Sequence, residues 1–286
     1  MRGATASYLR PFLIFMWNAG YVQDMLDIDG SPITRNGNSL ILAYDHGLEH
    51  GPVDFEDVPE SADPAHVFEV ARHDAVTALA VQKGVAEQYH SDYADDVNLL
   101  VKLNGTSNLW QPDDYYSPLN CTVDYAVEEL GADAVGYTLY AGSDHEDSMA
   151  ETFRDVQEAA HRHGVPVVMW AYPRGRGVKN DMKTGIISYA ARIGLELGAD
   201  IVKCKYPGSE EAMQEVVSVT GRTKVVMSGG SKRSDRAFLS DVHGTMRAGG
   251  NGLAVGRNIF QREEPTGILD KLEGVVFEGK DVDEVL

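Results

Sequence analysis

Residues 186–205 read IISYAARIGLELGADIVKCK, and this stretch contains the repeating unit of the fold. Apolar residues at helical spacing run over Ile186–Leu197 and stop at Gly198, the residue type that most often ends a helix in the left-handed conformation. A short apolar run, Asp200–Lys205, follows directly and is typical of a strand that is buried on both faces. The stretch therefore predicts one helix–strand step of a parallel α/β sheet.

The same step recurs along the chain. Two other helical stretches, Cys121–Leu130 and Ser148–His163, also end at a glycine and precede an apolar run. The predicted strands are Ser39–Tyr44, Val76–Val81, Asn98–Leu103, Ala134–Leu139, Pro166–Ala171, Asp200–Lys205, Lys224–Met227 and Gly252–Val255. Eight alternating strands and helices predict an α/β protein with a single closed (β/α)₈ TIM barrel, and an open doubly wound sheet is the runner-up. We expect residues 1–37 to be a leading segment and residues 38–286 to form the barrel.

Acidic residues dominate the charge of the chain. Asp and Glu number 44 against 25 Lys and Arg, which gives a net charge of −19. Many of the acids lie in stretches that look exposed, such as the one containing Asp54, Glu56, Asp57 and Glu60. Such a surface indicates adaptation to high salt, where charge repulsion is screened, so we expect unfolding at low salt and recovery when salt is added. No basic stripe appears, and no nucleic-acid partner is expected.

The sequence also bears on location. The two cysteines, Cys121 and Cys204, lie far apart and do not form a disulfide framework, as is usual in a reducing cytoplasm. The apolar run Pro11–Trp17 is too short to span a bilayer, so no membrane partner is expected. We interpret this run as a docking segment or as the product of a misplaced start codon, with Met25 as the alternative start.

Two lysines stand within the sixth predicted strand. Side chains alternate along a strand, so Lys203 and Lys205 share one face. A buried lysine is unfavourable unless it is paired or neutral, and burial together with a neighbouring cation lowers its pKa. A neutral amine can attack a ketone to form a Schiff base. We therefore expect Lys203, the deeper residue, to be a nucleophile activated by its neighbour, whereas Lys205 fits a structural ion pair equally well.

Other strand ends carry further candidates. Tyr172 ends the fifth strand, where a phenol could relay protons, and Trp170 shares its face but by itself is more typical of a core residue. Asp45 follows the first strand, where a carboxylate can steady an iminium or accept a proton. His46 and His50 raise the alternative of a metal site, but the sequence offers no third ligand at a convincing spacing. No metal is therefore expected.

Glycine-rich turns follow the last two predicted strands. Their candidate ligand-binding residues are Ser228, Gly229, Gly230, Gly256 and Arg257. Glycines let backbone N–H groups approach an anion, and phosphate sites recur in these two loops of the architecture. With Lys232 also close in sequence, the turns predict a site for a phosphorylated ligand. Lys102, in the third predicted strand, is either a further internal base or a paired structural lysine.

Together, several motifs resemble the archaeal-type (DhnA-type) class I fructose-bisphosphate aldolases, over about Asn38 to Arg262. The motifs are Leu40–Gly47 with Glu49–Pro52, Lys102–Gly105, Ala134–Thr138, Trp170–Gly175, Gly198–Lys203, Met227–Gly230 and Ala254–Asn258. Each is weak alone, and the combination is specific. The leading segment and Pro207 depart from the family pattern.

The resemblance implies a lyase without metal or other cofactor that reversibly cleaves fructose 1,6-bisphosphate in glycolysis and gluconeogenesis. It implies that Lys203 forms the Schiff base, that Tyr172 transfers protons, and that Asp45 and Trp170 belong to the active site. The glycine turns would bind one phosphate of a phosphorylated sugar, and Lys205, Lys102 or an arginine the other. Members of the family form homo-oligomers, commonly decamers, so we expect a cytoplasmic homo-oligomer.

Two alternatives to this function follow from the sequence. The related 2-amino-3,7-dideoxy-D-threo-hept-6-ulosonate synthases of archaeal aromatic amino-acid biosynthesis share the barrel, aspartate, tyrosine and lysine. They typically lack the pair Glu49-His50 and Trp170, so these residues favour the aldolase. A non-catalytic barrel that senses phosphosugars would have no need for Lys203 and Tyr172 together.

Overall fold

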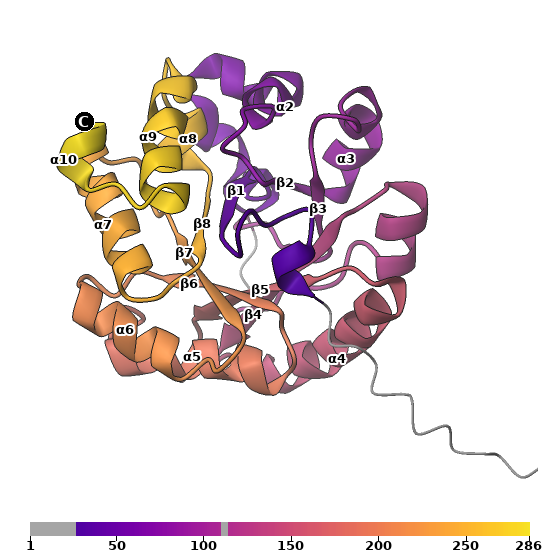
Figure 1. The fold of residues 1–286 in the computed structure, drawn as a ribbon. Coiled ribbons are helices and arrows are strands. Elements are labelled where there is room, and N and C mark those ends of the chain that lie inside the picture. Colours follow the sequence, from indigo (N-terminus) through magenta and orange to yellow (C-terminus); the bar gives the residue numbers. More distant parts are fainter. Residues whose placement is uncertain (1–26, 110–113) are drawn as a thin grey trace, which may run out of the picture.

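A closed barrel of eight parallel strands forms the centre of the molecule (Figure 1). The computed structural model of the chain describes residues 27–109 and 114–286. The strands are β1 (Ser39–Ala43), β2 (Ala78–Gln82), β3 (Leu99–Lys102), β4 (Ala134–Ala141), β5 (Val167–Pro173), β6 (Ile201–Lys205), β7 (Lys224–Ser228) and β8 (Gly252–Val255). Each strand pairs with the next in sequence and β8 pairs with β1, so the predicted (β/α)₈ barrel is confirmed.

The strands follow the sequence closely because both of their faces are buried. All eight predicted strands are present, and their ends differ from prediction by at most two residues. Ile201 packs in an inward-facing cluster with Trp170, whereas Val202 and Cys204 pack in the outer cluster beneath the helices. Alternation therefore turns the side chain of Lys203 to the inside of the barrel, as predicted.

Helices cover the outside of the barrel (Figure 1). They are α1 (Gly47–His50), α2 (Pro64–Ala71), α3 (Lys83–Tyr89), α4 (Glu146–His163), α5 (Thr184–Glu196), α6 (Glu210–Ser218), α7 (Asp235–Arg247), α8 (Arg257–Phe260), α9 (Pro265–Phe277) and α10 (Val282–Val285). Shorter turns are η1 (Ile28–Gly30), η2 (Gly51–Phe55), η3 (Pro59–Ala62), η4 (His90–Asp92) and the π-helical η5 (Tyr125–Glu129). The predicted helices at 148–163 and 186–197 correspond to α4 and α5, and Gly164 ends α4 with a φ of 73°.

The helix predicted over Cys121–Leu130 is shorter than expected. The N–H groups of Asn120 and Cys121 both donate to the carbonyl of Leu103, at 2.8 and 3.1 Å. This attachment to the end of β3 keeps the beginning of the segment out of a helix. Only the π-helical turn η5 and the residues just before it are helical.

The residues before β1 close the N-terminal end of the barrel. Ile33 is fully buried among the inward-facing side chains, and Asp29 pairs with Lys224 at the start of β7, at 2.5 Å. The described part of the predicted leading segment thus packs on the barrel. The run Pro11–Trp17 and the alternative start Met25 lie outside the described residues. Among the described helices, none combines the length and apolar character that crossing a bilayer requires.

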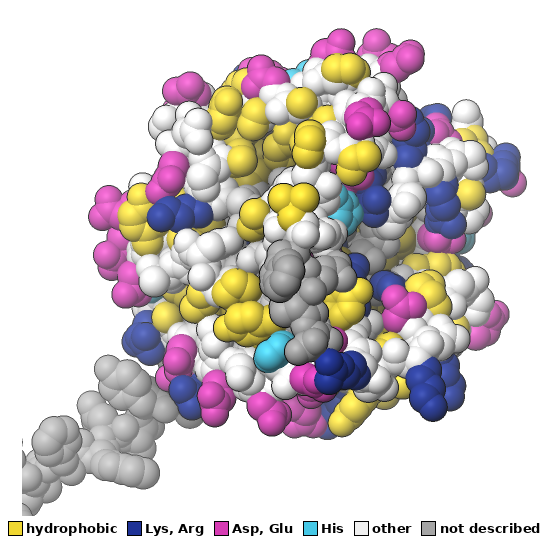
Figure 2. Space-filling view, turned by 180° about the vertical axis from the view of Figure 1, so that it is seen from behind, with side chains coloured by type: hydrophobic (Ala, Val, Ile, Leu, Met, Phe, Trp, Pro, Cys, Tyr) yellow, Lys and Arg dark blue, Asp and Glu magenta, His cyan; other side chains and the backbone are white. Residues whose placement is uncertain are grey.

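Charged side chains are spread over the surface. Figure 2 shows acidic side chains along the edges of the face seen there, interspersed with lysine and arginine. Asp54 departs from the predicted exposed acidic stretch because it is only 9% exposed. Its carboxylate contacts His46 and His50 instead.

Candidate active site

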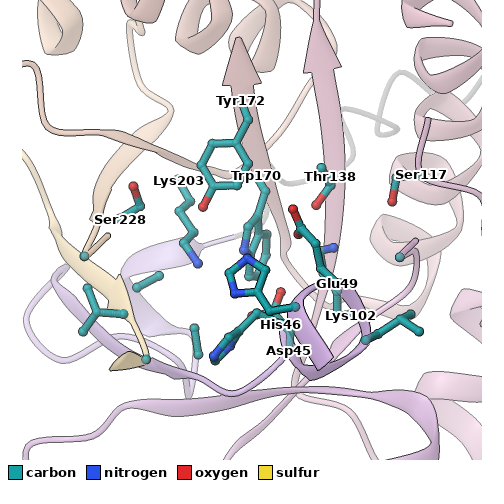
Figure 3. A pocket seen from close by; sticks show the side chains of 18 of the residues that line it. Asp45, His46, Glu49, Lys102, Ser117, Thr138, Trp170, Tyr172, Lys203 and Ser228 are labelled. Atoms are coloured by element: carbon teal, nitrogen blue, oxygen red, sulfur yellow. The ribbon is translucent and has the colours of Figure 1, made fainter. Parts of the chain in front are cut away.

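A pocket opens at the carboxyl ends of the strands, where the sequence predicted the chemistry. Every residue selected for the site lines this pocket: Lys203, Tyr172, Asp45, Trp170, Lys205, Ser228, Gly229, Gly230, Gly256 and Arg257. Figure 3 shows side chains from opposite sides of the barrel converging on one space. The barrel therefore assembles the predicted set, because the ends of parallel strands meet at one rim.

Lys203 projects from β6 into this pocket and is only 5% exposed. Burial lowers the pKa of its amine from 10.5 to about 8. The positive charges of Lys102 and Arg257 act in the same direction, and the carboxylate of Asp45 opposes them. Within the part of the chain that the structure describes, no hydrogen bond or ion pair engages Lys203 Nζ. An amine of lowered pKa without a partner is suited to nucleophilic attack.

Lys205 has a different environment, two residues further along β6. It forms an ion pair with Asp181, and its side chain is 22% exposed, so both solvent and a carboxylate stabilise its charge. The sequence predicted that Lys205 lowers the pKa of Lys203, but Lys205 is not among the groups with the largest effects on this pKa. The lysine that is among them is Lys102, which reaches the pocket from β3. Lys205 thus has the structural ion pair that its sequence position also allowed.

Trp170 is almost fully buried, with 2% of its surface exposed. The centroid of its ring lies 4.6 Å from Lys203 Nζ and 5.3 Å from Lys102 Nζ. Figure 3 shows the two lysines on either side of the tryptophan. Trp170 is therefore both a core residue, as its sequence alone suggested, and a pocket residue, as the resemblance implied.

Tyr172 ends the inward face of β5, and its hydroxyl points into the pocket (Figure 3). Burial raises the pKa of the phenol, and the negative charge of Asp45 adds to this effect. The positive charge of Arg174 and a hydrogen bond with Ser228 oppose it but do not cancel it. The phenol of the free protein therefore keeps its proton, which suits a group that passes protons to and from a substrate oxygen.

Glu49 is a pocket residue to which the sequence analysis gave no role. It accepts a hydrogen bond from Arg174 at 2.8 Å, and the Arg174 guanidinium lies 5.7 Å from the centroid of the Tyr172 ring. Arg174 therefore contacts both an acidic side chain and the ring of Tyr172. The position of Glu49 four residues after Asp45, in the short helix α1 that follows β1, was the available signal.

Asp45 is 9% exposed and lies at the end of β1. Gln82, at the end of β2, donates to its backbone carbonyl at 3.3 Å, which fixes the chain where the side chain enters the pocket. Its negative charge acts on both Lys203 and Lys102. A carboxylate and two lysines thus share one buried site.

Two glycines of these turns, Gly229 and Gly256, leave no space for a side chain. A Cβ at Gly256 would lie 2.1 Å from the carbonyl oxygen of Ala43, and one at Gly229 would lie 2.7 Å from Val255 Cγ1. Asn258 Nδ2 ties the first turn by donating to the carbonyl of Gly229 at 2.8 Å. Lys232 does not line the pocket, because its amine donates to the carbonyl of Gln261 instead.

A cluster of His46, His50 and Asp54 lies beside the pocket. His50 Nδ1 and His46 Nε2 lie 2.5 and 3.2 Å from the same Asp54 oxygen, and Arg257 lies 3.8 Å from the other. Burial alone would raise the pKa of Asp54, but the two imidazoles hold it well below its usual range. The prediction that no third ligand accompanies the histidines was wrong, since Asp54 contacts both. The guanidinium on the same carboxylate, however, disfavours a metal cation there.

Comparisons with known proteins agree with this geometry. Residues 39–262 match the model of the DeoC/LacD family of aldolases. A class 1 fructose-bisphosphate aldolase from Halobacterium salinarum is 62% identical over 264 residues, covering 92% of this chain and 99% of that protein. A class 1 fructose-bisphosphate aldolase from Thermoproteus tenax is 44% identical over 253 residues, covering 88% and 94%. The first relative also fits the predicted adaptation to high salt.

A solved structure of an archaeal fructose-1,6-bisphosphate aldolase has the catalytic lysine covalently bound to the carbinolamine intermediate of the substrate. It is similar to this protein with a TM-score of 0.81 and 43% identity, covering 85% of this chain and 96% of that chain. Sequence, barrel and family match thus lead to one conclusion: the chain belongs to the DeoC/LacD family of aldolases, together with the class 1 fructose-bisphosphate aldolases of archaea.

Proposed function

We propose that the chain is a class I fructose-bisphosphate aldolase, a carbon–carbon lyase that reversibly converts fructose 1,6-bisphosphate into dihydroxyacetone phosphate and glyceraldehyde 3-phosphate. The observation that carries the proposal is Lys203, a buried amine of lowered pKa whose Nζ has no hydrogen-bond or ion-pair partner in the described chain. Burying such a lysine is unfavourable and needs a functional reason. Two relatives are named class 1 fructose-bisphosphate aldolases, and each matches this chain over most of its length.

The reaction begins with the neutral amine of Lys203 attacking the C2 carbonyl carbon of the sugar. Loss of water from the carbinolamine gives an iminium, which serves as the electron sink for the next step. The positive charges of Lys102 and Arg257 favour the neutral amine before attack. Lys203 is therefore assigned the role of Schiff-base nucleophile.

Carbon–carbon cleavage then requires a proton acceptor at the C4 hydroxyl. The C4 hydroxyl passes its proton to the phenol oxygen of Tyr172 while the phenol passes its own proton to the carboxylate of Asp45. The C3–C4 bond then breaks, and its electrons move into the iminium to give an enamine. Glyceraldehyde 3-phosphate leaves, the enamine is protonated at C3, and water releases dihydroxyacetone phosphate. The raised pKa of Tyr172 suits the reverse direction equally well, because a protonated phenol can donate to an aldehyde oxygen.

The two phosphate groups would be held at opposite sides of the pocket. Ser228, Gly229, Gly230, Gly256 and Arg257 would hold one of them. Lys205 or Arg174 would hold the other, whereas Lys102 is too deeply buried, with 3% exposed. Such anchoring makes the attack of Lys203 effectively intramolecular, which contributes on the order of several kcal/mol.

The cellular setting completes the proposal. The enzyme acts in glycolysis and gluconeogenesis in the cytoplasm, as a homo-oligomer without nucleic-acid or membrane partners. Its catalytic domain is residues 38–286, and residues 1–37 form the leading segment. The acidic composition of the chain supports the proposal that the enzyme works in a cytoplasm of high salt concentration.

An enzyme assay tests the proposed function directly. Cleavage of fructose 1,6-bisphosphate is followed through a coupled assay of triose phosphate formation, at high salt and with a chelator present. We expect turnover that the chelator does not reduce. Absence of cleavage, combined with chelator-resistant product formation from an amino-acid semialdehyde, would replace the proposal with the aminoheptulosonate synthase. Thermal stabilisation by phosphosugars without any turnover would replace it with a sensor.

A further inference from the structure

A second buried lysine, Lys102 on β3, lies across Trp170 from Lys203. Lys102 is 3% exposed and Lys203 is 5% exposed, so both amines are largely removed from water. Their nitrogens lie 5.3 and 4.6 Å from the same ring centroid. The two nitrogens are therefore less than about 10 Å apart, a range over which charges interact strongly in a poorly hydrated site.

This arrangement depends on a glycine in the strand between them. Gly136 on β4 pairs in register with Lys102. A Cβ at Gly136 would lie 2.6 Å from Trp170 Cζ3, so a larger residue would push the indole away. Because Gly136 leaves room, the ring from β5 extends over β4 to reach Lys102. The electron-rich face of an indole attracts cations, and because the ring lies near both amines, it does not by itself decide which of them is charged.

The two amines differ in what holds them. Lys102 Nζ donates to the carbonyl of Asn104 at 3.0 Å, and hydrogen bonds of this kind are stronger when the donor is charged. Lys203 Nζ has no such acceptor among the described residues. Lys102 therefore fits the role of a fixed ammonium, and Lys203 that of a free amine.

The charge of Asp45 is the reason why one lysine must be charged if the other is to be neutral. A carboxylate next to a single buried lysine would form an ion pair with it and keep it protonated, and a protonated amine cannot attack a carbonyl. Burial lowers the pKa of both lysines, and the negative charge of Asp45 opposes this effect in both. With two lysines present, one charge can balance the carboxylate while the other amine stays neutral.

We propose that Lys102 is a positioning residue for Schiff-base formation: its ammonium, held by the carbonyl of Asn104, balances Asp45 and so leaves the amine of Lys203 unprotonated. This inference rests on the proposed role of Lys203 as the nucleophile. Lys102 itself forms no bond to the substrate. It acts on Lys203 through charge alone, which separates it from a purely structural residue.

The test is the pH dependence of borohydride trapping of dihydroxyacetone phosphate on Lys203, quantified by peptide mass mapping. Lys102→Met removes the charge, and Lys102→Gln also does so but can still donate to Asn104. We expect either variant to move the midpoint of trapping upward by about one pH unit, so that trapping at pH 7 falls about tenfold and recovers at higher pH. Lys102→Arg should keep the midpoint of the unmodified protein.

The matched control is Lys224→Met, which removes a lysine at the opposite end of the barrel, where it pairs with Asp29. It should leave the midpoint unchanged. Circular dichroism at high salt confirms folding, and Lys102→Gln serves if Lys102→Met does not fold. An unchanged midpoint in a folded neutral variant, with normal trapping on Lys203 in the unmodified protein, would overturn the role of Lys102 alone. No adduct on Lys203 in the unmodified protein would instead overturn the proposed function, and this inference with it.

Discussion

The two ends of the barrel treat lysine differently. At the N-terminal end, Lys224 pairs with Asp29 at 2.5 Å. At the carboxyl end, Lys205 is paired with Asp181, but the two deeper lysines have no ion-pair partner in the described chain. Among the same described residues, Lys102 donates a hydrogen bond only to the carbonyl of Asn104, and Lys203 donates none. Stability alone favours the first arrangement, since an unpaired buried lysine is costly. The difference indicates that the carboxyl end is organised for reactivity at the expense of stability.

Of all the mutations considered, removal of the nucleophile at the carboxyl end should have the largest effect, and this effect is on the rate of cleavage. Lys203→Met is expected to lower the rate of fructose 1,6-bisphosphate cleavage by at least about 10⁴-fold, because no Schiff base can form. The coupled assay at high salt measures this. Lys224→Met, which removes a lysine from the other end, should retain the activity. Cleavage by Lys203→Met within tenfold of the unmodified rate would show that the reaction takes another route.

Removing the phenol should separate binding of the ketone from bond cleavage. Tyr172→Phe is expected to lower kcat by about 10²- to 10⁴-fold, the usual contribution of a proton-transfer group. The borohydride adduct with dihydroxyacetone phosphate should still form on Lys203, since this step uses the amine. Loss of the adduct in a folded Tyr172→Phe protein would mean that Tyr172 serves Schiff-base formation instead.

The unfavourable burial of the amine should be measurable as a lower free energy of unfolding. Because the folded pKa of Lys203 is about 8 against 10.5 for an ordinary lysine, folding is penalised below pH 8, and the penalty disappears as the pH rises through 10.5. Lys203→Met should therefore raise the free energy of unfolding by about 3 kcal/mol at pH 7 and by little above pH 10.5. Urea unfolding at constant high salt measures both. An equal gain at both pH values would point to packing and not to charge.

The smallest effect on stability is expected at the N-terminal end of the barrel, where the lysine is paired. Asp29→Asn removes the partner of Lys224 and is expected to lower the free energy of unfolding by about 1 kcal/mol or less, because Asp29 is largely exposed. The loss should shrink further as salt is added, and cleavage activity should stay unchanged. Urea unfolding at two salt concentrations checks the first part. A large loss of activity would contradict the separation of the two ends.

The fold and much of the site could be predicted because they depend on patterns of residues that are close together in the sequence. Apolar runs and helix-ending glycines such as Gly164 and Gly198 mark the eight steps of the barrel. The position of a residue at a strand end, as for Asp45 or Tyr172, then places it at one rim. These signals depend only on neighbours along the chain.

What could not be predicted depends on contacts across the barrel. Lys205 is two residues from Lys203, yet the lysine that acts on Lys203 is Lys102, from a distant strand. Asp54 looked exposed among other acids, and it is buried because the turn η2 places it against two imidazoles. Glu49 is held in the pocket by a hydrogen bond from Arg174, which directly follows β5. Spacing along the sequence does not encode such partners.

The most direct test of the central claim is borohydride reduction in the presence of fructose 1,6-bisphosphate or dihydroxyacetone phosphate, at high salt with chelator, followed by peptide mass mapping. We predict a reduced adduct on the peptide at Lys203, with matching loss of activity. An adduct on Lys205 or Lys102 would contradict the assignment of the nucleophile. No adduct, together with activity abolished by chelator, would contradict the Schiff-base mechanism and point to His46, His50 and Asp54 as metal ligands.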